Sequence, residues 1–356
     1  MIIKKTDKNF YSIFNTETGF YVRSGVFVDG KETETDPFMA SFPELLDIGI
    51  MGSCVHGKTG LCLKAGIECY QDGLNIQNKN MSLEDYESIM KQCEGRLFQV
   101  AEGGRGDPDM HENFEEILKI TRKYNIVPNF TTSGLGMTPE KAEICKRYCG
   151  AVAVSWYRSD YTYKAIDMLL KAKVKTNIHY VLANNTIDEA IKRLENNDFP
   201  KGINAIVFLL HKPVGLGTEK NVLDINDPKL KRFFELVENP HPFKIGFDSC
   251  SCPAIVNLTN TINLNTIDYC EGGRYSAYID ADMNMMPCSF ANQDPSWFVS
   301  LKEHTVEEAW NSEVFEKFRN SLKNSCSKCK DKEHCAGGCP LLRSIVLCNR
   351  EEKDCR

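Results

Sequence analysis

The chain lacks the features of a membrane protein, a secreted protein and a nucleic-acid-coating protein. None of its 356 residues lies in an uninterrupted apolar run of about 18, so no segment is long enough to cross a bilayer. Residues 1–9 contain two adjacent lysines and no apolar stretch of the kind a secretory signal needs. The 43 Lys and Arg residues are outnumbered by 49 Asp and Glu residues, and the net charge of −6 argues against nucleic-acid binding. We therefore expect a cytoplasmic protein with no membrane or nucleic-acid partner.

Cysteine is abundant, at 16 positions. A cytoplasmic chain cannot keep so many cysteines in disulfides because that compartment reduces them, so this density indicates metal binding. Residues 150–249 contain no cysteine, whereas ten of the 16 lie beyond residue 249. The uneven distribution predicts a catalytic body followed by a metal-rich C-terminal region, which suits a length of about two domains.

Short apolar runs alternate with amphipathic segments between residues 46 and 248. The runs are rich in Val, Ile and Phe and are apolar on both faces, as buried parallel strands are. Ser82 and the pair Thr138-Pro139 are typical helix starts. About six strand–helix units predict a partial barrel whose chemistry lies at the C-terminal ends of its strands. The expected strands are Leu46–Met51, Leu97–Ala101, Ile126–Thr131, Ala151–Trp156, Thr176–Leu182, Ile203–Leu210 and Phe243–Phe247.

The two ends of the chain show weaker patterns. Residues 10–28 contain two short β-prone segments around a glycine-containing turn, which predicts a small hairpin. Beyond residue 249 we expect one amphipathic helix, near Thr305–Leu322. The residues expected on its apolar face are Trp310, Val314, Phe315, Phe318 and Leu322.

A glycine-rich loop with three cysteines follows the first expected strand. Cys54, Cys62 and Cys69 lie within it. Three thiolates on one loop can hold three irons of a [4Fe–4S] cluster and leave the fourth iron open to a small ligand. The alternative is that these are three unrelated thiols packed as small apolar groups.

A phosphate-loop pattern overlaps the same segment. Gly52, Gly57, Lys58 and Thr59 satisfy G-x4-G-K-T after a strand, which would cradle phosphates if a long helix began directly after Thr59. Gly60 follows at once, so such a helix is poorly supported. Nucleotide hydrolysis by a P-loop NTPase is therefore a minor alternative.

A second motif follows the strand expected at Leu97–Ala101. The next residues include Gly106-Asp107-Pro108, with His111 and Phe114 downstream. This arrangement resembles the radical S-adenosylmethionine family, in which the second strand ends in a G-G-E-P segment followed by a helix. Asp107 stands in place of the family's Glu, and Arg105 in place of its first glycine. The resemblance covers roughly residues 46–356.

The resemblance implies two cofactors at the barrel. The three cysteines of the first loop would bind the [4Fe–4S] cluster that holds S-adenosylmethionine, although their spacing is C-x7-C-x6-C and the family's is C-x3-C-x2-C. The acid and backbone of the Gly-Asp-Pro segment would bind the methionine amino group. The residues implied for cofactor binding are Tyr70, Gly104, Gly106, Asp107, Ser133 and Ser155. Further candidates at strand ends are Asn177, His179 and the glycine-containing segment His211–Gly217.

The C-terminal cysteines resemble the SPASM extension of this family, which holds two further [4Fe–4S] clusters. Residues 326–339 have the spacing C-x2-C-x5-C-x3-C. The ligands implied for one auxiliary cluster are Cys270, Cys288 and Cys339, with Cys252 or Cys250 as the fourth. Those implied for the other are Cys326, Cys329 and Cys335, closed by Cys355 or Cys348. Zinc is the alternative, because four-cysteine zinc sites use similar spacings. The cysteines expected to be ordinary thiols are Cys93, Cys145 and Cys149.

With this resemblance the fold class is α/β: a partial (β/α)6 TIM-like barrel with a cysteine-rich C-terminal domain. The expected division is an N-terminal hairpin extension over 1–45, a radical S-adenosylmethionine barrel over 46–248 and a SPASM-like auxiliary cluster domain over 249–356. The implied reaction is reductive cleavage of S-adenosylmethionine to a 5′-deoxyadenosyl radical, with the protein positioning the substrate. Most relatives with this extension modify ribosomally made peptides. We therefore expect oxidative modification of a peptide, such as a thioether or carbon–carbon crosslink, and a reductant such as flavodoxin or ferredoxin.

Three other functions remain open at this point. The substrate could be a small molecule or a sulfatase, although sulfatase maturases place an Asp where this chain has Ser289. A non-catalytic iron–sulfur electron carrier would explain the C-terminal cysteines but not the Gly-Asp-Pro segment at a strand end. The sequence does not identify a catalytic acid or base. Candidate pocket residues, from loop position alone, are His56, Arg105, Tyr157 and Arg158.

Overall fold

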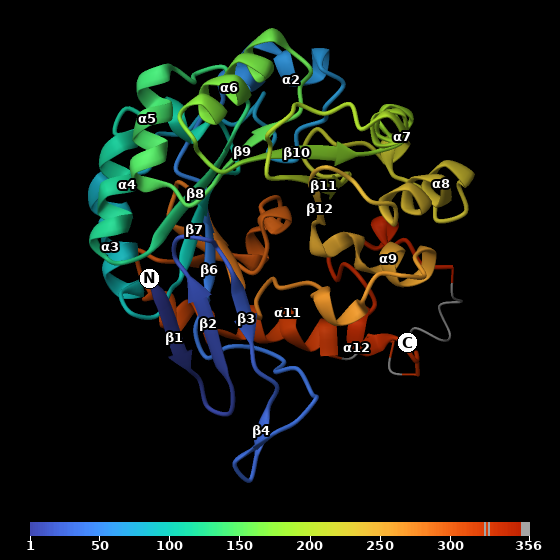
Figure 1. The fold of residues 1–356 in the computed structure, drawn as a ribbon. Helices are drawn as coiled ribbons and strands as arrows, with labels where there is room; N and C mark the ends of the chain where they lie inside the picture. Colours follow the sequence, from blue (N-terminus) through green and yellow to red (C-terminus); the bar gives the residue numbers. More distant parts are fainter. Residues whose placement is uncertain (324, 327, 350–356) are drawn as a thin grey trace.

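Parallel strands joined by helices form the centre of the protein. The structure is a computed structural model that describes residues 1–323, 325–326 and 328–349. The parallel strands are β6 (Leu45–Ile48), β7 (Gln99–Glu102), β8 (Val127–Thr132), β9 (Val152–Ser155), β10 (Thr176–Leu182), β11 (Ala205–Leu210) and β12 (Lys244–Phe247). The crossover helices are α3 (Leu83–Cys93), α4 (Phe114–Lys123), α5 (Pro139–Tyr148), α6 (Asp160–Lys171), α7 (Ile187–Asn196) and α8 (Pro228–Val237). Each strand pairs with the next along the chain, and α3, α4 and α5 lie side by side on the outer face (Figure 1).

The predicted strands and barrel are confirmed. All seven expected strands are present, with ends that differ by at most three residues. The first six are each followed by a crossover helix, which gives six β/α units and a final strand at one edge of the sheet. The helix starts are also as predicted, because the Ser82 side chain accepts a hydrogen bond from Asp85 N and that of Thr138 from Lys141 N.

Side chains on each strand alternate between the helices and the interior of the barrel. On β6, Leu46 and Ile48 are fully buried against α3, where they meet Tyr86 and Ile89. Asp47, between them, lines the interior cavity. The alternation of the strand pleat therefore decides which residues of each apolar run can take part in chemistry.

The predicted N-terminal hairpin is present within a three-stranded sheet. Its strands are β1 (Ile2–Thr6), β2 (Tyr11–Asn15) and β3 (Tyr21–Arg23), and a second small hairpin is formed by β4 (Phe27–Val28) and β5 (Lys31–Glu32). Phe14 pairs in register with Tyr21 and packs against Phe98 and Val127 at the N-terminal ends of the barrel strands. The hairpin thus covers the end of the barrel opposite the expected site, as its position beside β6 and β7 in Figure 1 indicates.

The C-terminal region joins the barrel through its sheet. Its elements include α9 (Cys252–Leu258), β13 (Ser276–Ile279), β14 (Asn284–Met286), β15 (Val299–Ser300) and α12 (Lys332–Cys335). Strand β13 pairs in parallel with β6, and β14 and β15 continue the sheet in antiparallel fashion. The sheet therefore runs across the predicted boundary at residue 248, and the division into three domains stays a prediction. No helix in the described part of the chain combines the length and hydropathy needed to cross a membrane.

The single helix predicted near Thr305–Leu322 is wrong. The structure has two helices, α10 (Val306–Trp310) and α11 (Glu313–Lys323). Arg319 on α11 lies 4.5 Å from the Trp310 ring, and its Nη2 donates a 2.8 Å hydrogen bond to the Trp310 carbonyl. Both side chains are buried, so the break allows a buried cation to satisfy a carbonyl at the end of α10.

Candidate functional site

A cavity of about 310 Å³ lies inside the barrel, at the C-terminal ends of its strands. All three cysteines of the first loop line it. Five of the six residues predicted to bind S-adenosylmethionine also line it, namely Tyr70, Gly104, Gly106, Asp107 and Ser155. The sixth, Ser133, lies directly behind Asp107. The residues predicted from two distant sequence motifs thus meet at one place.

The cysteine loop contains two short helices, α1 (Val55–Thr59) and α2 (Leu61–Lys64). Cys54 caps α1, and its Sγ accepts a 3.4 Å hydrogen bond from Gly57 N. Burial raises the pKa of Cys62 to about 12, so an iron ion that displaces its proton would have to offset this cost. Helix α1 ends at Gly60, whose φ of 67° is left-handed, directly after Thr59. The long helix that a phosphate loop requires is therefore not formed here.

Two glycines hold the surrounding loops against the cysteine loop. Gly106 has a φ of +72°, and a Cβ there would lie 2.6 Å from the Ser53 carbonyl oxygen. Gly215, in the segment after β11, has a φ of +66°, and a Cβ there would lie 2.5 Å from the Tyr70 carbonyl oxygen. Both positions thus require glycine because backbone approaches backbone. Gly215, in the predicted segment His211–Gly217, therefore supports the cysteine loop in the structure.

Asp107 is fixed by a buried hydrogen-bond network. Its Oδ1 accepts a 2.8 Å hydrogen bond from Ser133 N, and its Oδ2 accepts one of 2.5 Å from Ser133 Oγ. His56 Nε2 lies 2.6 Å from the same Ser133 Oγ and 3.5 Å from Asp107 Oδ2. Ser133 thus orients the carboxylate from behind while the carboxylate faces the cavity. Among the loop candidates, His56 and Tyr157 also reach the cavity, whereas Arg105 and Arg158 hydrogen-bond to the cysteine-loop backbone.

Two titratable side chains from the barrel strands face the cavity from opposite sides. Burial raises the pKa of Asp47 on β6 to about 7, and this carboxyl faces Tyr70 and Tyr278. Burial lowers the pKa of His179 on β10 to about 4, so its imidazole is neutral at pH 7. Sequence reasoning missed Asp47, although an acid inside the apolar run Leu45–Ile48 was a visible signal. The cavity therefore contains a carboxyl group that changes its charge close to neutral pH.

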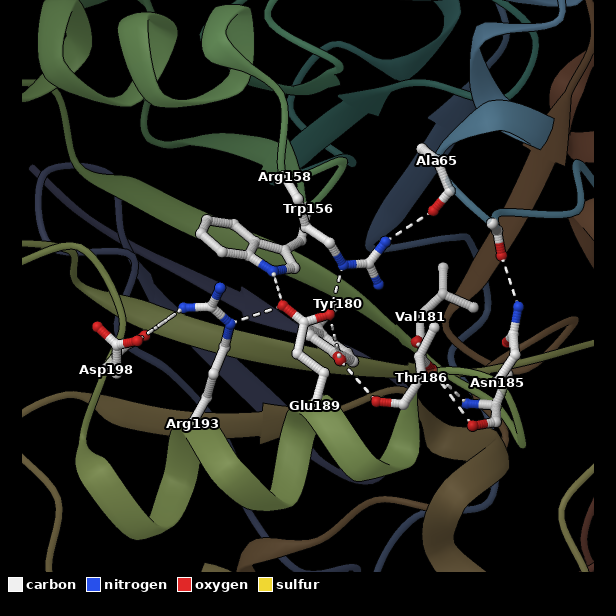
Figure 2. A network of polar contacts seen from close by, with 12 residues as sticks. Ala65, Trp156, Arg158, Tyr180, Val181, Asn185, Thr186, Glu189, Arg193 and Asp198 are labelled. Carbon is white, nitrogen blue, oxygen red and sulfur yellow. Dashed lines mark hydrogen bonds and ion pairs between the residues drawn. The ribbon is translucent and has the colours of Figure 1, made fainter.

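A polar network anchors the cysteine loop to helix α7. Figure 2 shows Glu189 receiving hydrogen bonds from Trp156, Arg158 and Arg193. Arg158 Nη1 also donates a 2.7 Å hydrogen bond to the Ala65 carbonyl in the cysteine loop. Asn185 Nδ2 donates one of 2.8 Å to the carbonyl of the next residue, Gly66. Side chains of the barrel thus hold the cysteine loop in place, and the spacing of its cysteines did not predict these contacts.

Replacing Arg158 with methionine is expected to loosen the cysteine loop. The change removes the contact with Ala65 and leaves Glu189 with its Arg193 partner. We expect incomplete loading of the metal that the cysteine loop would bind, measured by iron assay after reconstitution. Arg193→Met is the matched control, since it removes a cation from the same carboxylate without touching the loop. Equal effects of the two substitutions would contradict an anchoring role.

Four C-terminal cysteines approach one another beside β12. The Cys250 thiol interacts with Cys339, and it interacts electrostatically with Cys270 and Cys288. The Cys252 thiol donates a 3.1 Å hydrogen bond to the Asp268 carbonyl. Of the two candidates for the fourth ligand of this cluster, Cys250 therefore has the closer association with the other three, and we favour it over Cys252.

Four further cysteines line a second cavity, of about 160 Å³. The cysteines on its wall are Cys326, Cys329, Cys335 and Cys348. Cys355 lies outside the described residues, so Cys348 is the fourth thiol at this cavity within the described part of the chain. Within that part, no three His, Cys, Asp or Glu side chains converge as ligands of one metal ion. Four thiols around one cavity are a ligand set that either a [4Fe–4S] cluster or a zinc ion takes.

Comparison with known proteins adds a family match and fold relatives. Residues 270–335 match the SPASM family, described as an iron-sulfur cluster-binding domain. Streptococcus suis SuiB bound to S-adenosylmethionine superposes with a TM-score of 0.72 at 15% identity, covering 98% of this chain and 99% of SuiB. SuiB bound to the precursor peptide SuiA gives 0.71 at 15% identity, with 98% of each chain covered. The structure of anSMEcpe with bound AdoMet gives 0.58 at 18% identity, covering 87% of this chain and 88% of anSMEcpe.

These likenesses confirm the predicted fold. The chain has the partial barrel and C-terminal extension of the fold that SuiB and anSMEcpe share. The SPASM match contains five of the predicted auxiliary ligands, and Cys339 and Cys348 follow it in the sequence. Residues 270–335 thus match an iron–sulfur cluster-binding domain, whereas the assignment of individual ligands stays a prediction.

Proposed function

We propose that this chain is a radical S-adenosylmethionine enzyme that oxidatively modifies a ribosomally made peptide. The observation that carries the proposal is the meeting of three loop cysteines with Asp107 in one cavity at the strand ends. An electron carrier has no need for such a cavity. The SPASM match at residues 270–335, which follow the barrel in the sequence, supports the auxiliary clusters. Each such cluster can accept an electron from a substrate.

The fold relatives support a peptide as the substrate. SuiB, whose fold covers 98% of this chain, has been seen with its precursor peptide SuiA. The anSMEcpe protein has been seen with bound AdoMet and the Cp18Cys peptide, at a TM-score of 0.57 and 17% identity. A thioether or a carbon–carbon crosslink are both oxidations that this arrangement serves, and we propose this class of product.

Different residues would have different roles at the cavity. When bound, the first [4Fe–4S] cluster and S-adenosylmethionine supply the electron and the radical that start the reaction. Cys54, Cys62 and Cys69 would hold three irons of that cluster. Asp107, oriented by Ser133, would bind the methionine amino group as a carboxylate. Asp47 faces the same space and would accept a proton that the substrate loses.

Anaerobic reconstitution tests the proposal. The protein is loaded with iron and sulfide and given S-adenosylmethionine and dithionite, and 5′-deoxyadenosine is measured by chromatography. Formation of 5′-deoxyadenosine is expected even without a substrate. A protein that carries redox-active clusters but yields no 5′-deoxyadenosine would instead be an iron–sulfur electron carrier.

Asp47 is expected to titrate near neutral pH. Its carboxyl is protonated below about pH 7, because burial raises its pKa to about 7, and it is ionised above that pH. An infrared difference spectrum between pH 6 and pH 8 should therefore show the loss of a protonated-carboxyl band from Asp47, beside contributions from Glu102 and Asp109, whose pKa values burial raises to about 8 and about 6. The band should be missing in Asp47→Asn and present in Asp282→Asn, which alters an exposed acid hydrogen-bonded to Asn78. An unchanged band in Asp47→Asn would exclude this carboxyl.

We further propose that an acidic reductant, such as a flavodoxin or ferredoxin, docks on the cysteine loop. In residues 55–79 the exposed charged side chains are all lysines, Lys58, Lys64 and Lys79. The two acids of this segment are half-buried and hydrogen-bonded, Glu68 to Thr218 and Asp72 to Asn75. Exposed apolar side chains at Val55, Leu63 and Leu74 lie among the lysines in sequence. This cationic and apolar surface, on a chain of net charge −6, complements an acidic partner.

The double substitution Lys58→Glu and Lys64→Glu is expected to slow the reduction of the first cluster by flavodoxin hydroquinone about tenfold or more at low salt. The reason is that electrostatic steering accelerates association between opposite charges. Stopped-flow absorbance measures the rate, and dithionite, a small reductant, should reduce the variant as fast as the wild type. The Lys171→Glu and Lys231→Glu double variant, on α6 and α8, is the charge-matched control. Equal slowing by that control would place the docking surface elsewhere.

A further inference from the structure

A buried charge pair lies between the barrel cavity and the cysteines assigned to the first auxiliary cluster. Lys212, two residues beyond β11, is only 5% exposed, and its ammonium forms an ion pair with Asp248 directly after β12. The same Asp248 carboxylate accepts hydrogen bonds of 3.1 Å from Leu210 N and 2.9 Å from Ser251 Oγ. The carboxylate is thus held by three donors, and the ammonium is held by the carboxylate.

The pair is placed so that the ammonium acts on the cluster cysteines. Lys212 Nζ lies 4.6 Å from the centre of the Phe290 ring, two residues beyond Cys288, and Asp248 is two residues before Cys250. The ammonium is thus held between the segment that carries Cys288 and the segment that carries Cys250.

On the other side, Asp248 acts on His179, which lines the barrel cavity, and favours its protonated form against burial. The pair therefore spans the wall between the cavity and the cysteine group. A buried ion pair is weak evidence for a stabilising role, because desolvation of both charges offsets their attraction. An effect on a neighbouring charged group is a better reason for its presence.

We propose that Lys212, positioned by Asp248, raises the reduction potential of the auxiliary cluster held by Cys250, Cys270, Cys288 and Cys339. The proposal rests on the proposed function, because it assumes that these thiols hold a [4Fe–4S] cluster. Reduction adds one negative charge to a cluster already made negative by its thiolates. A buried cation held beside the ligand-bearing segments stabilises the reduced state more than the oxidised state, since the local dielectric is low.

The raised potential suits this cluster to accept electrons from the cavity. When bound, the cluster would supply an acceptor for the one electron that a substrate radical loses on oxidation, and a base such as the carboxylate of Asp47 would take the proton that leaves the substrate. Lys212 contacts neither the substrate nor the reacting atoms in this scheme. It is a positioning residue that sets the direction of electron flow.

Redox titration of the reconstituted holoenzyme, followed by electron paramagnetic resonance, tests the proposal without any substrate. The titrations use the Cys62→Ala background, which removes the signal of the first cluster. In Lys212→Met we expect at least a tenfold lower ratio of reduced to oxidised cluster at a given applied potential. This corresponds to a midpoint reduction potential about 59 mV more negative. Lys212→Arg should stay near the parent value because it keeps the charge. Only one of the two auxiliary midpoints should move, and the other serves as an internal control.

Asp248→Asn provides a second, opposite test. Removing the anion leaves the ammonium less compensated, so the same midpoint should become more positive. If Lys212→Met fails to bind its auxiliary cluster, the midpoint potential of Asp248→Asn still tests the proposal. Unchanged midpoints, or shifts of both substitutions in the same direction, would overturn the proposal. Failure of the parent protein to bind any auxiliary cluster would instead count against the proposed function.

Discussion

Replacing Cys62 with alanine is expected to abolish formation of 5′-deoxyadenosine, with a loss of at least about 1,000-fold. Cys62 is buried, lines the barrel cavity and would hold one of three irons, so its loss leaves too few thiolates to retain the cluster. Iron should fall from roughly 12 to roughly 8 atoms per chain, because three four-iron clusters become two. Product chromatography and iron assay measure the two effects.

Cys149→Ala is the matched control for this substitution. Cys149 lies at the end of α5, outside all three cysteine groups, and is expected to be an ordinary thiol. The control should keep both its iron content and its activity. If Cys62→Ala still produces 5′-deoxyadenosine, the first cluster is not held by this loop and the proposed function fails with it.

The second large effect is expected for Asp107→Asn. The substitution keeps the shape of the side chain and removes its negative charge, so the methionine amino group of S-adenosylmethionine loses its counter-ion. We expect affinity for S-adenosylmethionine to fall about 100-fold, which corresponds to about 2.7 kcal/mol. Equilibrium binding to the reconstituted protein measures it, and the iron content should not change.

Asp109→Asn is the control for the change in charge. Asp109 is two residues away and fully buried, and its Oδ1 accepts a 2.7 Å hydrogen bond from Thr132 Oγ1. It is not among the residues that line the cavity. Its substitution should leave affinity for S-adenosylmethionine within about twofold of the wild type. Equal losses in the two variants would mean that Asp107 acts through folding and not through the ligand.

Local signals predicted most of the barrel. Each of the seven strands is a short apolar run bounded by polar residues, and such a run is buried in any parallel sheet. The helix starts at Ser82 and Thr138 follow from contacts within three residues. The spacing of the C-terminal cysteines is equally local, because a cluster requires thiolates at short separations along the chain. These features lie within a few residues of sequence, so the sequence alone predicts them.

Local sequence patterns did not predict the break between α10 and α11. The apolar period from Trp310 to Leu322 is intact, yet the structure has two helices there, and Arg319 of α11 donates a hydrogen bond to the Trp310 carbonyl at the end of α10. The period describes which side of a helix is buried, and two successive helices can share that property. A buried cation contacts the carbonyl at the break, and no pattern of apolar residues encodes that contact.

The strands of the barrel, the two cysteine-rich groups and Asp107 beyond β7 could all be predicted from the sequence alone. Tertiary structure decided which of these residues meet. It placed Asp47 in the cavity, Cys250 beside Cys339 and Lys212 beside both Asp248 and Phe290. The last two contacts join residues from different strands, helices or loops, more than 30 positions apart in sequence. The reason is physical: spacing along a chain fixes only what lies within one strand or turn, whereas the register of the sheet and the packing of its loops bring distant residues together.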